Sequence, residues 1–378
     1  MLYTIIIFIL ILSLLVFVHE IGHFVAAKKM GVKVEEFGFG LPPKIFGIKK
    51  GETTYSINWL PIGGFVRLKG ENGGAKADKD SFGYKKPWQK AIILVSGVAM
   101  NFVLAFIIIS LGLTLGYPQI IEENNIEKFA KIKNEQIQIL AIMENSPAEE
   151  LGIPLGAIID NIDGIVFENT EEIQDYINEK GGEKILLGLK LEESLVMKEL
   201  LPMEVTNDLK DIVRENQSYI MGASLIKTGV VRYPFYVAPY KGAEMTLSLT
   251  KEIIVAFYSL IRNLLFTGKA SVPLTGPVGI AILTDQIAHM GFIYLLQFIA
   301  ILSINLGIIN IFPFPALDGG RLLFLGIAKL KGKAVDEGTE NLAHNIGFLI
   351  LILLIVVITY KDVRTYQSMF VDFFKRIF

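Results

Sequence analysis

The sequence contains no cysteine and only 4 histidines among 378 residues. A disulfide framework is therefore impossible, and any metal site must use histidine, aspartate or glutamate. Charge is also scarce, at 20% of residues with a formal net charge of -2, so nothing in the overall balance indicates nucleic-acid binding. Apolar residues, in contrast, make up 52% of the chain and give a mean hydropathy of +0.49. This composition is typical of a membrane protein.

Two of the histidines lie in the segment HEIGH, residues 19–23, within an otherwise uncharged apolar run from residue 2 to residue 27. Residues four apart share one face of a helix, so His19 and His23 can bind one metal ion while Glu20 polarises a bound water. An ionisable group at membrane depth is costly and therefore indicates function. The alternative is a signal anchor that carries polar residues at its end.

Four apolar stretches reach the length of about 20 residues that spans a bilayer. They are residues 2–27, 91–117, 290–312 and 342–360. The first has no basic n-region and no small-residue cleavage site, so we expect it to remain in the mature protein. Residues 28–90 carry 13 Lys and Arg against 6 Asp and Glu, which the positive-inside rule assigns to the cytoplasm. The basic C-terminal tail opposes this assignment.

Residues 124–230 indicate a folded domain between the second and third spans. Short β-like runs, residues 137–143 and 184–190, flank one predicted helix, residues 170–179. Residues 144–164 resemble the ligand-binding region of a bacterial PDZ domain, although Ala157 stands where such domains usually have aspartate. A β-rich domain of another kind is the alternative.

A further apolar segment, residues 246–266, is broken by Lys251, Glu252 and Arg262. These charges favour an amphipathic helix at the membrane interface over a fifth span. We assign residues 240–270 to this helix.

A catalytic zinc site needs a third protein ligand, and the best candidate is Asp318 in the segment NIFPFPALDGGR, residues 310–321. Its prolines must end the third span, and its two glycines allow a tight turn before another helix. Such irregular backbone at membrane depth is tolerated where it lines protein or a water-filled cavity. His289 and His344 are more typical of interfacial histidines, and a helix-capping role is the alternative for Asp318.

The loop between the first two spans contains three predicted strands, residues 34–40, 53–59 and 63–69, separated by Pro- and Gly-rich turns. An exposed strand edge there, such as residues 34–38, could bind an extended substrate by backbone pairing. The alternative is an ordinary cytoplasmic hairpin packed against the spans.

HEIGH, the GxxxNF of residues 97–102, the PDZ-like insert and NxxPxPxLDGGR together resemble the site-2 protease family of intramembrane zinc metalloproteases. The resemblance is to the bacterial regulator-of-sigma-E type with a single PDZ-like domain. It implies that His19, His23 and Asp318 bind Zn2+, that Glu20 is the catalytic base and that Asn310 holds substrate. It also assigns Gly38 and Gly40 to a membrane-associated β-loop that contacts substrate.

The expected fold is a polytopic α-helical membrane protein of about four transmembrane helices, with the β-loop and an inserted extracytoplasmic PDZ-like α+β domain. The expected parts are residues 1–117, 124–230, 240–270 and 286–378, in the bacterial cytoplasmic membrane with the zinc site near its cytoplasmic face. Expected partners are membrane lipid, transmembrane protein substrates such as anti-sigma factors or signal-peptide remnants, and a substrate stub at the PDZ-like domain. An inert membrane-tethered PDZ scaffold and a metal transporter are the rival functions. Glu20 between paired histidines and the absence of repeated halves oppose transport.

Overall fold

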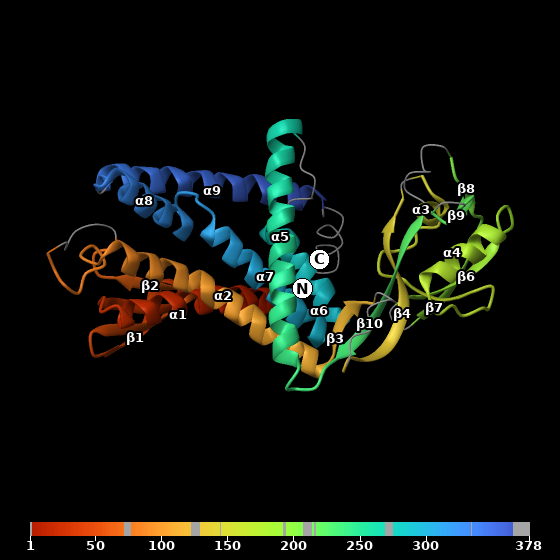
Figure 1. The fold of residues 1–378 in the computed structure, drawn as a ribbon, viewed down its shortest axis with the longest axis horizontal. Helices are drawn as coiled ribbons and strands as arrows, with labels where there is room; N and C mark the ends of the chain where they lie inside the picture. The colour runs from red at the N-terminus through yellow and green to blue at the C-terminus, as the bar shows by residue number, and fades with distance from the viewer. Residues whose placement is uncertain are drawn as a thin grey trace, which may run out of the picture. The chain divides into compact units, whose positions relative to one another are not determined.

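The computed structural model describes residues 2–71, 77–121, 129–143, 145–191, 194–206, 214, 217–268, 275–333 and 335–365. The chain forms two compact units (Figure 1). One consists of residues 1–112 and 236–378, here called the membrane unit. The other consists of residues 113–235, here called the insert.

Four helices of the described residues are long and apolar enough to cross a membrane, as the sequence predicted. They are α1 (Leu2–Lys29), α2 (Pro87–Leu115), α7 (Phe292–Ile311) and α9 (Glu337–Thr365). Only 6% of the most apolar 18-residue stretch of α9 is buried, and its side chains Leu349, Leu353 and Val356 are exposed. Side chains this apolar have no reason to face water, so lipid is the solvent that fits this surface.

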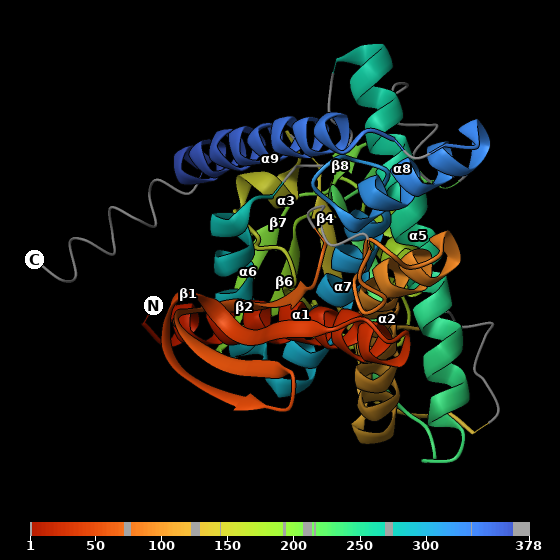
Figure 2. The same cartoon turned by 90° about the vertical axis from the view of Figure 1, so that its left-hand side faces the viewer.

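Helix α5 (Ala238–Thr267) covers the segment predicted to be amphipathic and is not among the four apolar candidates. It stands across the direction of α1 and α9 in both views (Figures 1 and 2). Leu247, Leu265 and Phe266 on this helix are exposed. These features agree with a helix that lies along the membrane surface, which remains a prediction.

Helix α6 (Pro277–Met290) was not anticipated from the sequence. It is too short to span a bilayer and packs against α1, α7 and α9. Its first turn is capped from a distant part of the chain, because Oδ2 of the buried Asp362 accepts hydrogen bonds from the backbone N–H groups of Gly276 and Gly279.

The β-loop consists of two long strands, β1 (Val34–Lys50) and β2 (Thr53–Leu68), so the prediction of three short strands was wrong. Gly40 and Gly63 have φ of +78° and +74°, and they bend the strands without ending the ladder. As a result residues 36–39 pair with residues 54–57 on one side and with residues 64–67 on the other. Residues 34–38, suggested above as an edge, therefore lie largely inside the sheet.

The insert contains a six-stranded sheet in the order β3-β10-β4-β5-β6-β7. These strands are β3 (Tyr117–Ile120), β4 (Lys131–Ile142), β5 (Ile158–Ile162), β6 (Ile185–Leu191), β7 (Ser194–Leu200) and β10 (Ala223–Arg232). The predicted helix is confirmed as α4 (Thr170–Glu179). The insert also contains the short helix α3 (Pro147–Glu150) and the short strand pair β8 (Met203–Glu204) and β9 (Tyr219–Ile220). Ile173 and Ile177 of α4 join Ile159 and Leu187 in one buried core.

Candidate metal centre and active site

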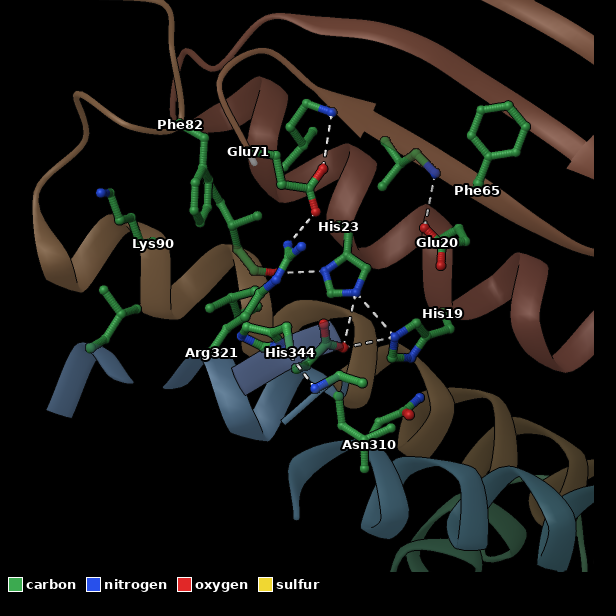
Figure 3. Close-up of a pocket in the computed structure, with 18 of the residues that line it drawn as sticks. His19, Glu20, His23, Phe65, Glu71, Phe82, Lys90, Asn310, Arg321 and His344 are labelled. Atoms are coloured by element: carbon green, nitrogen blue, oxygen red, sulfur yellow. Dashed lines mark hydrogen bonds and ion pairs between the residues drawn. The ribbon is translucent and has the colours of Figure 1, made fainter. Parts of the chain in front are cut away.

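The membrane unit contains a cavity of about 930 Å³ whose lining comes from α1, β2, α2, α7, α8 (Asp318–Lys331) and α9. Charged and polar side chains border it, as Figure 3 shows for Glu20, Glu71, Lys90, Arg321 and His344. Since the surrounding helices are apolar, this is a polar chamber within a membrane-embedded body.

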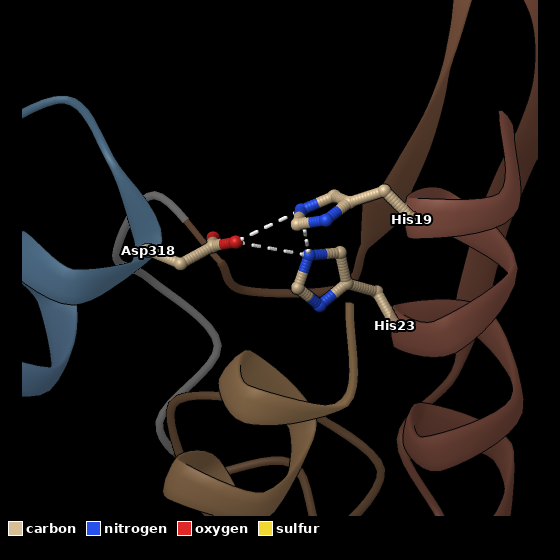
Figure 4. A group of neighbouring side chains, drawn as sticks. All are labelled: His19, His23 and Asp318. Atoms are coloured by element: carbon tan, nitrogen blue, oxygen red, sulfur yellow. Dashed lines mark hydrogen bonds and ion pairs between the residues drawn. The ribbon is translucent and has the colours of Figure 1, made fainter. Parts of the chain in front are cut away.

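The HEIGH segment lies in the C-terminal half of α1, and both of its imidazoles point to the same side of the helix (Figure 4). His19 and His23 are buried, and their Nε2 atoms lie 3.0 Å apart. Helix α2 passes very close to this face. A Cβ added at Gly97 would overlap Nε2 of His23 and lie 2.9 Å from Cε1 of His19, and one added at Gly22 would overlap the carbonyl oxygen of Ser96. Gly22 thus permits the close approach of α1 and α2, and Gly97 leaves the space in which the imidazoles lie.

Asp318 reaches the histidines from the other end of the sequence. Helix α7 ends at Ile311, two prolines follow, and α8 (Asp318–Lys331) begins within seven residues. Cβ atoms added at Gly319 or Gly320 would overlap backbone carbonyls of the preceding turn, so the LDGG turn needs both glycines. Oδ2 of Asp318 lies 3.0 Å from Nε2 of His19 and 3.2 Å from Nε2 of His23. The helix-capping alternative is not supported, because Asp318 is already the first residue of α8 and its carboxylate faces the imidazoles.

The Asp318 carboxylate can supply an anionic oxygen donor beside the two imidazole nitrogens.

The donor set fits zinc. Three buried or half-buried donor atoms, two imidazole nitrogens and one carboxylate oxygen, lie within 4.8 Å of one another. Ligand atoms at tetrahedral corners about 2.0–2.1 Å from zinc lie about 3.3 Å apart, close to the separations found here. Three protein ligands also leave the open position that a catalytic zinc requires.

The other predicted site residues lie around this centre. Glu20 borders the cavity, and its Oε2 accepts a hydrogen bond of 3.0 Å from the backbone N–H of Val66 in β2. Asn310, at the end of α7, borders the same cavity (Figure 3). Gly38 and Gly40 are needed for packing inside the β-loop, because an added Cβ would overlap the ring of Phe65 at Gly38 and the carbonyl oxygen of Leu60 at Gly40. Their contact with substrate remains a prediction.

Sequence reasoning missed several residues of the site. Asn101 was noted only as part of a motif, and its side chain contacts Nδ1 of His19 at 3.2 Å. His344, expected at the interface, borders the cavity, and its Nδ1 accepts a hydrogen bond of 2.8 Å from the N–H of Ala316. The side chain of His289 lies outside the described residues. Helical spacing placed Gly97 and Asn101 on one face, but nothing in the sequence indicated that α1 covers that face.

Comparison with known proteins identifies the chain. Residues 7–354 match the family described as Peptidase family M50. The chain belongs to that family. This M50 peptidase is a zinc metalloprotease, so the scaffold and transporter alternatives are not supported.

Its relatives span nearly its full length. The Regulator of sigma-W protease RasP of Bacillus subtilis is 30% identical over 443 residues, covering 96% of this M50 peptidase and 98% of RasP. Zinc metalloprotease RasP of Geobacillus kaustophilus is 31% identical over 429 residues, with 96% and 98% covered. A protein of Clostridium acetobutylicum is 34% identical over 362 residues, with 96% and 97% covered.

The insert has a weaker likeness to solved structures. The PDZ domain of an SdrC-like protein from Listeria monocytogenes is 19% identical and covers 25% of this chain and 92% of that domain, with a TM-score of 0.21.

Proposed function

We propose that this M50 metalloprotease hydrolyses peptide bonds within the transmembrane segments of single-span membrane proteins, after another protease has trimmed their outer domain. The observation that carries the proposal is the placement of Glu20 and the three ligands in a polar cavity bordered by α1, α2, α7 and α9. Anti-sigma factors and signal-peptide remnants are the substrate classes, and the name of the Bacillus subtilis relative refers to regulation of sigma-W.

The chemistry follows from the residues around the cavity. His19, His23 and Asp318 would hold a zinc ion, which would supply Lewis-acid polarisation of the scissile carbonyl and a lowered pKa of water. Glu20 accepts a proton from the water whose oxygen attacks the carbonyl carbon. It then returns that proton to the amide nitrogen as the C–N bond breaks, so that a carboxylic acid and an amine form and leave as carboxylate and ammonium after proton exchange. Asn310 is the residue placed to hold the substrate backbone.

A helical substrate hides its peptide bonds, so the stretch to be cut must become extended. The edge of β2 nearest the site, residues 64–68, can hold an extended substrate by backbone pairing. The N–H groups of Val66 and Leu68 point away from β1 and are occupied by Oε2 of Glu20 at 3.0 Å and Oε2 of Glu71 at 3.3 Å. Carboxylate oxygens therefore hold the positions that the carbonyls of an added strand would take. Pairing at Val66 would release Glu20 toward the water.

Strand addition predicts an alternating pattern of sensitivity in the substrate. Single backbone N-methyl groups placed along a synthetic transmembrane peptide should slow cleavage about tenfold at every second position and little between them, because a paired strand turns alternate N–H groups to its partner. Cleavage of each peptide in detergent, with the unmethylated peptide as control, gives the pattern. A helical repeat of three to four positions would contradict strand addition. Proline substitutions along residues 34–38 would instead test hairpin folding, because most of that segment is paired on both sides.

The excess of Lys and Arg in residues 28–90 supports one orientation of the protein in the membrane. The positive-inside rule puts the β-loop and the zinc site at the cytoplasmic side of the bacterial cytoplasmic membrane and the PDZ-like insert outside. The insert then cannot take part in bond cleavage. Its proposed role is to exclude substrates that still carry a bulky outer domain, which needs no tight peptide binding.

Removing the insert should therefore relax the requirement for trimming. Because β3 pairs with β10, the deletion should run from residue 117 to residue 233, with Gly/Ser linkers of several lengths in its place. We expect untrimmed substrate to be cut at close to the rate of trimmed substrate. Rejection of untrimmed substrate by a deletion variant that keeps its zinc would contradict the filter, and loss of trimmed-substrate cleavage alone would indicate a docking role.

The proposed function itself is tested with the purified full-length chain. Zinc per chain and cutting of a tagged single-span substrate, with the cut site located by mass spectrometry, are the two measurements. Cuts confined to soluble flanking residues would contradict intramembrane proteolysis even if zinc is bound.

A further inference from the structure

Asn101 is a fully buried polar side chain next to the candidate zinc ligands, and it has no role in the chemistry described above. It lies on α2, four residues after Gly97, with no exposed surface. Its Nδ2 lies 3.2 Å from Nδ1 of His19, while its Oδ1 is buried and has no hydrogen-bond partner. A buried amide inside a membrane helix is costly, so an unpaired oxygen beside a metal ligand calls for an explanation.

His23 shows what a zinc-binding imidazole needs. Its Nδ1 lies 2.8 Å from the carbonyl oxygen of Ile93, which can only accept, so Nδ1 carries the proton. Nε2 is then left with its lone pair directed at Asp318 and His19, as metal ligation requires.

His19 needs a proton on Nδ1 in the same way, but an Asn101 amide with its Nδ2 toward His19 does not allow one there. An amide nitrogen can only donate, so an Nδ2 facing Nδ1 of His19 would place the imidazole proton on Nε2, where zinc must bind. Amide oxygen and nitrogen have nearly the same shape, and a half-turn of the Asn101 amide puts the unpaired Oδ1 against Nδ1 of His19. Helix α2 would then supply an acceptor to each histidine, a backbone carbonyl for His23 and a side-chain oxygen for His19.

We propose that Asn101 is a positioning residue of the zinc site, whose Oδ1 accepts the Nδ1 proton of His19 and so fixes the tautomer that leaves Nε2 free to bind zinc. The inference concerns the metal site and not the proposed substrate. It can therefore be tested without any cleavage assay, and its failure would leave the proposed function untouched.

The test compares Asn101→Asp with Asn101→Leu in the full-length protein. Aspartate keeps an acceptor of the same shape and has no donor, whereas leucine has neither. The readouts are the rate at which the purified protein loses zinc to excess chelator and the ligand-field spectrum of the cobalt-substituted form. Ser303→Ala is the matched control, because the Ser303 hydroxyl donates to the backbone carbonyl of Asn101 and not to its side chain.

We expect Asn101→Leu to lose zinc about 10- to 100-fold faster than the wild type, the usual cost of removing a partner of a metal ligand. Asn101→Asp should hold zinc at least as long as the wild type and keep its cobalt spectrum, and Ser303→Ala should change neither. If aspartate loses zinc as fast as leucine, the amide acts as a donor and the proposal is wrong. Wild-type zinc retention in Asn101→Leu would also overturn it. Because aspartate matches asparagine in size, its result decides the matter even if the leucine variant does not fold.

Discussion

Replacing Glu20 by glutamine is expected to lower cleavage by about 10²- to 10⁴-fold, the usual contribution of a general base. Zinc should remain at about one ion per chain, because Glu20 is not among the three ligand side chains. Glutamine has nearly the same shape and its amide oxygen can still accept the N–H of Val66, so the fold around the site should not change. Zinc analysis and the cleavage rate of one trimmed substrate are the measurements.

Asp318→Asn is the contrasting variant. It keeps the shape of the side chain but removes the anionic ligand, so zinc content and cleavage should fall together. Cleavage by Glu20→Gln at the wild-type rate would show that the proposed proton transfer is wrong. Loss of zinc in both variants would mean instead that Glu20 belongs to the metal site.

Replacing Gly97 by alanine is expected to empty the zinc site and with it to remove cleavage, by about 10²-fold or more. The added methyl group would overlap Nε2 of His23 and crowd His19, so both imidazoles must move or α1 and α2 must separate. Close-packed interiors do not absorb such a shift without loss of geometry. Zinc per chain and the cleavage rate measure the effect.

Gly326→Ala is the matched control, since Gly326 also lies in a helix but nothing stands within 4 Å of an added Cβ. This variant should keep zinc and activity. Thermal unfolding of both variants in detergent separates a local effect from a general one. If Gly97→Ala keeps its zinc and cleaves normally, the helices are further apart than the structure shows.

Local sequence was sufficient for the elements that depend on local physics. The length of an apolar run fixed the four spans, because a bilayer sets the number of residues needed. Helical spacing put His19 and His23 on one face, and prolines with glycines predicted the break before Asp318. In the insert, α4 has the predicted bounds.

Contacts between distant segments were decided only by the tertiary structure. The β-loop was predicted as three short strands, although it consists of two long ones. Bends at Gly40 and Gly63 let one strand pair on both sides, and in a sequence such a bend resembles a turn that ends a strand. Two further features could not be predicted from the sequence. One is the edge of β2 whose N–H groups are occupied by Glu20 and Glu71. The other is the close approach of α2 to α1, which brings Gly97 and Asn101 against the histidines. Spacing along one helix tells which residues share a face, but only packing decides which other helix covers that face and what its side chains then touch.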